Sequence, residues 1–253
     1  MQFVRVADGG EVRTITLDRP ERLNALGAEV LASLEEVVRE TATSSSRVVV
    51  VNGAGRVFSA GADLKDARPA PESWQAGRRE SGRWGRLLDA VEALPQVTVA
   101  SVHGAVIGGA VLLAAACDFR VATGDAFFQI PELAIGIPLT WAGNPRLVRE
   151  IGLPHARDMV MTGRRVSAQE AERWGLVHRL VDDLDAGTRE LVDALLAMPE
   201  APLGMTKEAF RALGRTLVSH EAAWADPDLL AAARNERESA EAAQAYVERT
   251  LGT

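Results

Sequence analysis

The sequence contains a single cysteine, Cys117, among 253 residues. No disulfide can form within such a chain, and structural zinc held by a Cys-x-x-Cys pair is disfavoured. A lone thiol fits a reducing compartment, so we expect a cytoplasmic protein in which Cys117 is a small core residue. The 22 glycines and 11 prolines are ordinary numbers for a folded domain of this length, which excludes collagen-like and disordered chains.

Positive charge is also limited. The chain carries 28 Lys and Arg against 35 Asp and Glu, for a formal net charge of -7, and it has no basic block. Nucleic-acid binding is therefore disfavoured, because it needs clustered cations to contact phosphates. The N-terminal residues show no signal-peptide pattern. Residues 97–117 lack charge, but polar residues and three glycines interrupt them, so we expect a buried core segment and no membrane span.

Most motifs that carry chemistry are missing. The sequence has no G-x-S-x-G, no G-x-x-x-x-G-K-[ST] and no strict G-x-G-x-x-G, which disfavours a hydrolase elbow and nucleotide phosphate loops. Its four histidines stand apart from one another without ligand spacing. We therefore expect no metal site and no redox cofactor.

The patterns that are present predict a layered α/β fold. Residues 3–6 and 12–17 read as a β-hairpin, and apolar residues from 30 to 38 follow helical spacing up to a serine-rich loop. Continuous β-branched runs at 48–51 and 97–102 predict strands buried on both faces. A further strand is expected at 127–130, and from about residue 186 the composition becomes helical.

Two neighbourhoods of the chain resemble each other. Each begins with a buried strand, continues through a Gly-Ala pair and reaches a small-residue turn, at Ala60-Gly61-Ala62 in one and Gly108-Gly109-Ala110 in the other. This weak repeat indicates stacked strand–turn–helix units. Between them, residues 67–86 are rich in Arg, Gly, Ser and Pro and carry Trp74 and Trp84, a composition typical of a mobile covering segment.

Two backbone amides and one carboxylate are the candidate chemical groups. Ala62 and Gly109 stand at helix starts, where unpaired N–H groups can converge on an oxyanion, although each glycine turn alone is explained by tight geometry. Glu132 is a single acid among Phe, Leu, Ile and Ala neighbours. If it is buried, its raised pKa suits a general acid or base, and an exposed loop glutamate is the equal alternative.

These residues resemble the crotonase, or enoyl-CoA hydratase/isomerase, superfamily over nearly the whole chain. The resemblance implies a spiral of ββα turns that binds acyl-CoA, at residues 1–195, and a helical oligomerisation region, at residues 196–253. It also implies trimers or dimers of trimers. The matching segments are Arg19-Pro20-Glu21-Arg22-Leu23-Asn24-Ala25-Leu26, Phe58-Ser59-Ala60-Gly61-Ala62-Asp63-Leu64, His103-Gly104 with Gly108-Gly109-Ala110, Cys117-Asp118, Pro131-Glu132-Leu133 with Gly136-Ile137-Pro138, and Pro145-Arg146-Leu147.

The resemblance also assigns roles to single residues. The amides of Ala62 and Gly109 fall where the family polarises the thioester carbonyl of an acyl-CoA and stabilises an enolate. CoA arrives as part of the substrate, so no separate cofactor is implied. The positions that line its pantetheine and adenine portions are Arg22, Leu23, Ala60 and Asp63.

One position departs from the family pattern. Typical hydratases activate water with two glutamates, and here the second is Glu132 while the first is replaced by Leu112. We therefore expect an enoyl-CoA isomerase that moves the double bond of a 3-enoyl-CoA to give a 2-enoyl-CoA, with Glu132 as proton shuttle. Leu112, Pro131 and Trp141 are assigned to the substrate pocket, although a core indole is the commoner role for Trp141.

Three alternatives stay open. The chain could be a hydratase that uses one glutamate, or a non-catalytic acyl-CoA-binding protein. The burial and direction of Glu132 would separate a binder from an enzyme, because a binder has no need of a carboxylate at the thioester. A hydrolase using Ser59 or Cys117 is the weakest alternative, because neither has a base at a fixed motif distance.

Overall fold

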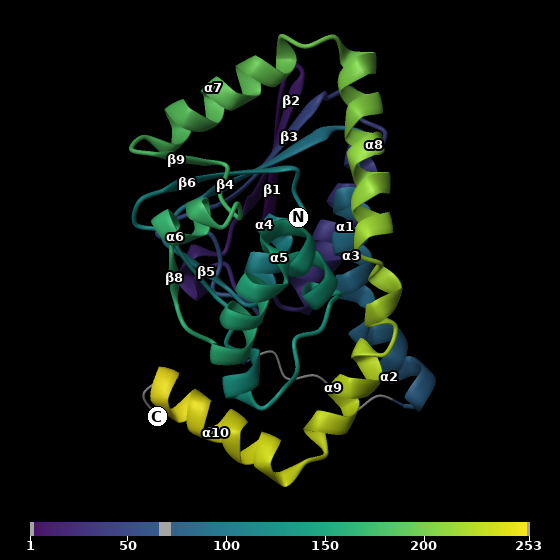
Figure 1. The fold of residues 1–253 in the computed structure, drawn as a ribbon, viewed down its shortest axis with the longest axis vertical. Helices are drawn as coiled ribbons and strands as arrows, with labels where there is room; N and C mark the ends of the chain where they lie inside the picture. The colour runs from purple at the N-terminus through teal and green to yellow at the C-terminus, as the bar shows by residue number, and fades with distance from the viewer. Residues whose placement is uncertain (1–2, 66–71, 252–253) are drawn as a thin grey trace.

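A six-stranded sheet forms the centre of the computed structural model, which describes residues 3–65 and 72–251 (Figure 1). The first two strands pair antiparallel, as the hairpin prediction required, and the other neighbours run parallel. Both faces of the middle strands are buried, which explains their runs of valine. In spatial order the strands are β1 (Val4–Gly9), β2 (Val12–Leu17), β3 (Val48–Gly53), β4 (Val97–Val102), β6 (Phe119–Thr123) and β9 (Arg179–Val181).

A second, smaller sheet lies beside the first. Its parallel pair is β5 (Ala105–Ile107) and β7 (Phe127–Gln129), and β8 (Val166–Ser167) joins β7 antiparallel. Each of β4 and β6 is followed by one of these short strands and then by a helical turn, α4 (Gly109–Ala115) or η2 (Glu132–Ile135). The chain therefore winds in successive turns of one long strand, one short strand and one helix.

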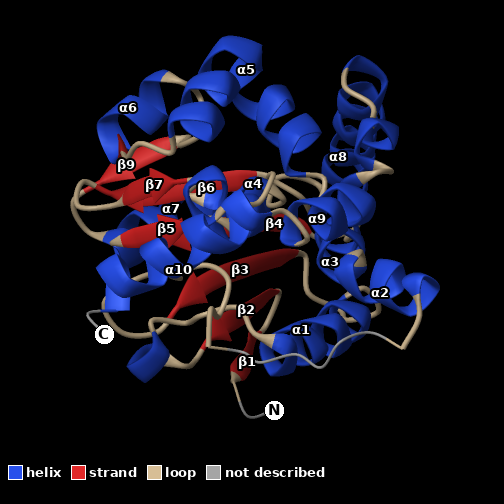
Figure 2. Ribbon diagram, turned by 90° about the horizontal axis from the view of Figure 1, so that it is seen from below, coloured by secondary structure: helices blue, strands red, loops and turns tan. Residues whose placement is uncertain are grey.

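Helices cover both faces of the main sheet (Figure 2). Side chains of one parity on β3 and β4 pack with α1 and α3, and those of the other parity pack with α7, as the alternation of strand side chains requires. Besides α4 and η2, the helical elements up to Leu196 are η1 (Pro20–Arg22), α1 (Ala28–Thr41), α2 (Trp74–Ser81), α3 (Arg83–Glu92), α5 (Gly143–Thr162), α6 (Ala168–Arg173) and α7 (Leu184–Leu196).

The C-terminal part is helical, as predicted. In Figure 1, α8 runs along the right side of the sheet, and α9 and α10 lie across the bottom of the molecule. The last helix packs against η2: a Cβ on Gly136 would lie 2.4 Å from the Ser239 carbonyl oxygen. These elements are α8 (Glu200–Leu217), η3 (His220–Ala223), α9 (Asp226–Arg234) and α10 (Arg237–Leu251).

The prediction of a mobile covering segment at residues 67–86 is wrong for Trp84, which is a core residue on α3, whereas α2 buries no residue. Residues 67–71 lie outside the described part, but α2 and the start of α3 occupy the rest, and Trp84 is only 2% exposed. Trp84, Leu87, Leu88 and Val91 follow the i, i+3, i+4, i+7 spacing of a buried helical face, which the surrounding Arg, Gly and Ser residues obscured.

No helix in the described residues is long and apolar enough to cross a bilayer.

Candidate active site

The two glycine turns predicted from the sequence lie against each other. Ser59 bridges to the strand β5 through its own backbone: its N–H donates to the Ala105 carbonyl at 3.2 Å, and the Ile107 N–H donates to the Ser59 carbonyl at 3.1 Å. Gly61 follows with φ of 80°, and a Cβ there would lie 2.3 Å from the Ile107 carbonyl oxygen. Only glycine permits this approach, which brings the turn at Ala62 beside the turn at Gly109.

The amides of Ala62 and Gly109 are free to bind a ligand. A bridge to Leu26 uses the groups on either side of Ala62, because Leu26 N–H donates to the Gly61 carbonyl at 2.7 Å and Asp63 N–H donates to the Leu26 carbonyl at 3.4 Å. Gly109 is the first residue of α4, so its N–H has no partner within the helix. Within the described residues, neither amide donates to another backbone carbonyl. Two adjacent free donors form a candidate oxyanion hole.

Asn24 holds the first turn in place, a role that the sequence did not reveal. It is 1% exposed with φ of 54°. Its side-chain amide donates to three carbonyls in the segment that leads to Ala60, and its Oδ1 accepts from the Arg19 N–H at 2.9 Å. An amide among Leu23, Ala25 and Leu26 was the available signal. The backbone on which the hole depends is thus fixed by a fully bonded buried side chain.

The Glu132 carboxylate lies beside the turn that carries Gly109. Glu132 begins η2, and a Cβ on Gly108 would lie 2.6 Å from its Oε1, so the carboxylate lies directly over the glycine that precedes Gly109. Its Oε2 is buried without a hydrogen-bond partner among the described residues. Burial raises the pKa of Glu132 to about 7, against an ordinary value of 4.5, so the group can take up and release a proton near neutral pH.

Trp141 forms the other wall beside the hole. A Cβ on Gly109 would lie 1.9 Å from Cζ3 of the indole, and Trp84 stacks on the ring with centroids 4.7 Å apart. Trp141 and Ala142 both adopt positive φ, of 62° and 54°. The Ala142 N–H donates to Asp226 Oδ2 at 2.9 Å, so α9 braces this strained turn and the ring it carries.

The four positions assigned to CoA lie together, because residues 22 and 23 contact the turn around Ala62. Ala60 N–H donates to the Leu23 carbonyl at 2.9 Å, and Arg22 pairs with Asp63 at 3.2 Å. Arg19 also pairs with Asp63, at 3.0 Å. Burial alone would raise the pKa of Asp63, but the Lys65 amide and the two guanidinium groups outweigh it and lower that pKa below its usual value.

The remaining predicted pocket residues are buried. Leu112 on α4 is 1% exposed and meets Leu139 across Gly143, where a Cβ would lie 2.9 Å from Leu112 Cδ1. Pro131 is buried as the residue before η2. Leu112 thus places an apolar side chain where the hydratase pattern has an acid.

Neither candidate nucleophile is available for hydrolysis. The Ser59 hydroxyl is 0% exposed, donates to the Asn24 carbonyl and accepts from the Gly61 N–H. Cys117 is buried, and this burial raises the pKa of its thiol to about 12. Both side chains are packed inside the fold. A thiolate nucleophile needs a partly exposed, electropositive environment instead.

The sequence predicted that His220 is isolated. In the structure its ring lies beside Asp89 and Glu92. Its Nδ1 lies 2.9 Å from Asp89 Oδ1. The two carboxylates are already engaged by guanidinium groups, with Arg146 at 3.1 Å from Asp89 and 2.8 Å from Glu92, and Arg149 at 2.5 Å from Glu92. The cluster is therefore an ion-pair network that joins α3 to α5 and η3, and its carboxylates are already neutralised.

Comparison with known proteins decides the family. The model of the family described as "Enoyl-CoA hydratase/isomerase" matches residues 8–251. The chain belongs to the enoyl-CoA hydratase/isomerase family. It is 39% identical over 216 residues to the "Probable enoyl-CoA hydratase EchA12" of Mycobacterium tuberculosis, covering 83% of this chain and 74% of that protein. It is also 39% identical over 202 residues to the "Putative enoyl-CoA hydratase/isomerase YngF" of Bacillus subtilis, covering 78% and 75%.

Solved structures of the family agree with the fold. The chain superposes on an enoyl-CoA hydratase/isomerase from Xanthobacter autotrophicus Py2 with a TM-score of 0.86 and 31% identity, covering 98% of this chain and 93% of that one. An enoyl-CoA hydratase from Mycobacterium avium subsp. paratuberculosis K-10 gives 0.86 at 28% identity, covering 98% and 96%. The predicted crotonase fold with its C-terminal helices is confirmed, and the chain is an enzyme of this family.

Proposed function

We propose that this enoyl-CoA hydratase/isomerase family enzyme is an isomerase that converts a 3-enoyl-CoA into a 2-enoyl-CoA. The thioester oxygen accepts hydrogen bonds from the amides of Ala62 and Gly109. Glu132 removes a proton from C2, the negative charge spreads over the dienolate and its oxygen, and the same carboxyl group returns the proton to C4. The double bond then lies between C2 and C3, and Glu132 is regenerated.

The observation that carries the proposal is the Glu132 carboxylate beside the two glycine turns, whose buried Oε2 has no partner among the described residues. A shuttle of one proton between two carbons needs one group whose pKa is near neutrality, which the burial of Glu132 supplies. Hydration needs a second polar group, because a water molecule must be oriented and deprotonated as well. The side chain at the first acidic position of hydratases is here the apolar Leu112, which offers no lone pair to a water.

The CoA part of the substrate is assigned to the patch of Arg22, Leu23, Ala60 and Asp63. Paired side chains and backbone groups there offer polar contacts without a net negative charge. Pro131, Leu112 and Trp141 are assigned to the acyl side of the site. The contact of the Trp141 ring with Gly109 supports this assignment.

The proposal is tested by assaying matched 3-enoyl-CoA and 2-enoyl-CoA substrates at several chain lengths. We expect isomerisation to exceed hydration at every length, and hydration that outruns isomerisation would contradict the assignment. Leu112→Glu should raise hydration relative to isomerisation if the missing acid limits water chemistry. Because a buried charge destabilises a core, thermal unfolding of this variant is measured alongside. Binding without any turnover would favour a non-catalytic acyl-CoA-binding protein.

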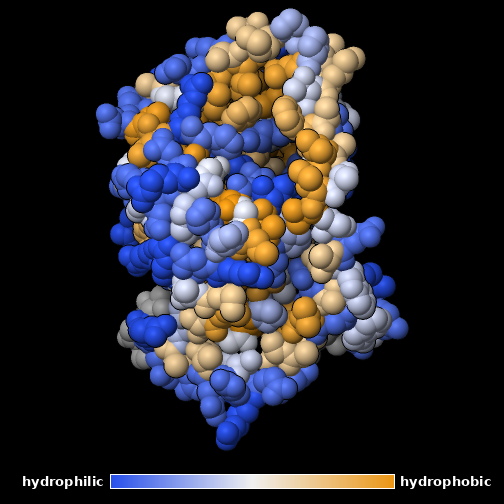
Figure 3. All heavy atoms as spheres, in the orientation of Figure 1, coloured by the Kyte–Doolittle hydropathy of each residue, from blue (hydrophilic) through white to orange (hydrophobic). Residues whose placement is uncertain are grey.

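We also propose that the enzyme is a trimer or a dimer of trimers, assembled through helices that follow residue 195. Figure 3 shows apolar atoms gathered along α8. A groove of about 510 Å³ separates this helix from the edge of the core, and Phe119, Leu203 and Leu213 are among its apolar walls. Large apolar side chains exposed on α8 are Met205 (72%), Phe210 (68%), Leu213 (52%) and Leu217 (72%). A surface patch of this kind is typical of an interface.

Light scattering tests the assembly. We expect a mass of three or six chains at micromolar concentration, and dissociation or aggregation of Phe210→Asp with Leu217→Asp. Met161→Asp is the matched control, because Met161 is 70% exposed but lies on α5. A monomeric wild-type protein would contradict this part of the proposal.

A further inference from the structure

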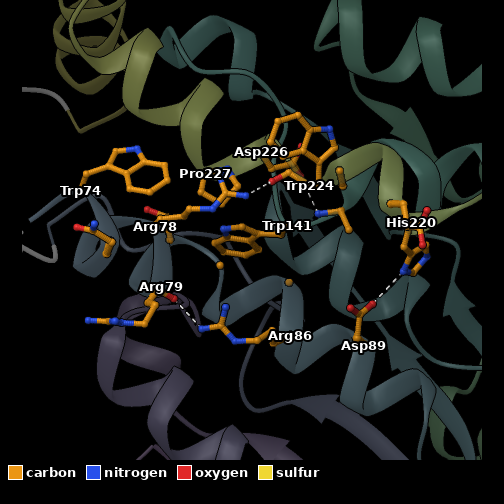
Figure 4. A pocket seen from close by; sticks show the side chains of 17 residues that line it. Trp74, Arg78, Arg79, Arg86, Asp89, Trp141, His220, Trp224, Asp226 and Pro227 are labelled. Carbon is orange, nitrogen blue, oxygen red and sulfur yellow. Dashed lines mark hydrogen bonds and ion pairs between the residues drawn. The ribbon is translucent and has the colours of Figure 1, made fainter.

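Three of the five tryptophans line one cavity, and a fourth stacks on one of them. The cavity has a volume of about 630 Å³ and lies between α2, α3 and the segment that includes η3 and α9 (Figure 4). Trp74, Trp141 and Trp224 line it, and Trp84 stacks on Trp141 with an angle of 14° between the two rings. Aromatic residues make up only 5% of the chain, so this concentration of indoles is a local feature and not a general property.

Trp141 belongs to both the cavity and the candidate active site. The indole of this residue contacts Gly109 at the oxyanion hole, and the same residue lines the cavity together with Ala142 and Gly85. Gly85 packs against the turn that carries Trp141, where a Cβ would lie at an ordinary contact distance of 3.6 Å from Trp141 Cα. An acyl group whose thioester occupies the hole is therefore adjacent to this ring.

The outer walls of the cavity are held by Arg78. Its guanidinium lies 5.7 Å from the ring centroids of both Trp74 and Trp224. It also pairs with Asp228 and donates to the Trp224 carbonyl at 2.6 Å. A cation between two indoles, tied to α9 by an ion pair, fixes both rings before any ligand arrives.

Charge does not select the occupant of the cavity. Three guanidinium groups and three carboxylates line it, so their formal charges cancel, and Figure 4 shows them distributed around the tryptophans. Asp89 is occupied by Arg146 and His220, and Arg86 donates to the Arg79 carbonyl at 2.6 Å. The largest apolar surfaces left to contact a ligand are the faces of the indoles.

We infer that the enzyme takes acyl-CoA thioesters whose acyl group ends in a planar, aromatic ring. Indole faces attract aromatic rings in stacked and edge-to-face arrangements beyond the area that they bury, whereas a flexible alkyl chain gains only the burial. A cavity of about 630 Å³ is within the range of small-molecule sites and is large enough for such a ring. The inference rests on the proposed function, because it assumes that a CoA thioester binds at Ala62 and Gly109.

Binding of unreactive thioesters tests the inference without turnover. The saturated probes 4-phenylbutanoyl-CoA and decanoyl-CoA each carry ten acyl carbons, and their Kd values are measured by isothermal titration calorimetry. We expect the phenyl thioester to bind roughly three- to tenfold more tightly. Trp141→Leu should abolish this ratio, and Trp74→Leu and Trp224→Leu, which alter exposed side chains, should reduce it. Trp174→Leu is the matched control, since Trp174 is half-buried like Trp141 but stacks on His155, outside the cavity.

The outcomes separate this inference from the proposed function. Equal binding of the two probes, or equal loss of the ratio in Trp174→Leu, would overturn the aromatic preference and leave the CoA site intact. Tighter binding of adipoyl-CoA, which ends in a carboxylate, than of either probe would also overturn it and assign recognition to the arginines. Failure of every CoA thioester to bind would overturn both proposals together.

Discussion

Two carboxylates flank the Ala62 and Gly109 turns in opposite environments. Asp63 is paired with Arg19 and Arg22 and accepts from the Lys65 amide, so its pKa lies below the usual value. Glu132 has a buried oxygen without a partner among the described residues, so its pKa rises to about 7. The same chemical group can therefore stay ionised at one side of the site and exchange a proton near neutral pH at the other.

The difference assigns the two sides of the site to different tasks. An ion pair held by two guanidinium groups organises backbone and binds polar parts of a ligand, but it cannot release a proton near neutral pH. A desolvated carboxyl group is poor at holding charge and suited to proton transfer. Substitutions on the two sides should consequently change different kinetic constants.

The largest effect is expected for Glu132→Gln. Removal of the base should lower kcat roughly 10²- to 10⁴-fold, with the Kd of an unreactive thioester nearly unchanged, because shape is retained. Glu29→Gln, an exposed position on α1, is the control and should be fully active. Full activity in Glu132→Gln would place the base elsewhere and remove the contrast between the two sides.

Gly61→Ala should separate the two turns. The added Cβ would lie 2.3 Å from the Ile107 carbonyl oxygen at a residue with positive φ, so the Ala62 and Gly109 amides can no longer converge. Loss of one oxyanion donor lowers kcat by roughly 10²- to 10³-fold. Gly124→Ala is the control, since the nearest atom is a side-chain nitrogen at 3.5 Å. Circular dichroism and unfolding curves should exclude misfolding, and a fully active Gly61→Ala would refute the shared oxyanion hole.

The protonation of Glu132 should also appear in the free energy of unfolding. Its folded-state pKa of about 7 exceeds the ordinary value of 4.5, so the folded protein loses stability as pH rises through this window. Glu132→Gln does not ionise and should be more stable than wild type by about 1–3 kcal/mol at pH 8, and nearly equal below pH 4.5. Urea denaturation at several pH values measures the difference. A variant that is less stable at pH 8 would contradict the burial penalty.

The smallest effect is expected on the CoA side. Arg22→Gln removes one of two cations that pair with Asp63, and Arg19 remains in place. We expect KM to rise about three- to tenfold with kcat nearly constant, as for a contact made equally in ground and transition states. A fall in kcat with unchanged KM would show instead that this side contributes to the chemistry.

The sequence predicted those parts of the molecule whose patterns are local. The β-hairpin, the valine strands β3 and β4 and the helix α1 follow from period and turn residues within short windows. The helical face around Trp84 was missed because arginine, glycine and serine surround it. The three-residue strand β5 was missed as well, since it is too short for an alternating pattern to appear.

The site was predicted only as separate pieces. Glu132, Ala62 and Gly109 were identified, but burial of Glu132 and exposure of it were equally compatible with the chain around Pro131. Its environment depends on contacts far apart in sequence, such as Ser239 on α10 against Gly136. The brace from Asp226 to Ala142 spans 84 residues and has no sequence signal. Long-range packing, which local patterns do not encode, sets the chemistry of the carboxylate.

The pH dependence of kcat/KM for a 3-enoyl-CoA tests the central claim most directly, because this ratio reports the essential groups of the free enzyme. The account predicts that kcat/KM rises with pH through a midpoint near 7, where the Glu132 carboxyl loses its proton, and then reaches a plateau. The rise should be absent from the residual activity of Glu132→Gln. A midpoint near 4.5 would show that Glu132 titrates as an ordinary solvated carboxylate, and the same rise in Glu132→Gln would assign the titration to another group. Either result would contradict the role of Glu132 as the proton shuttle.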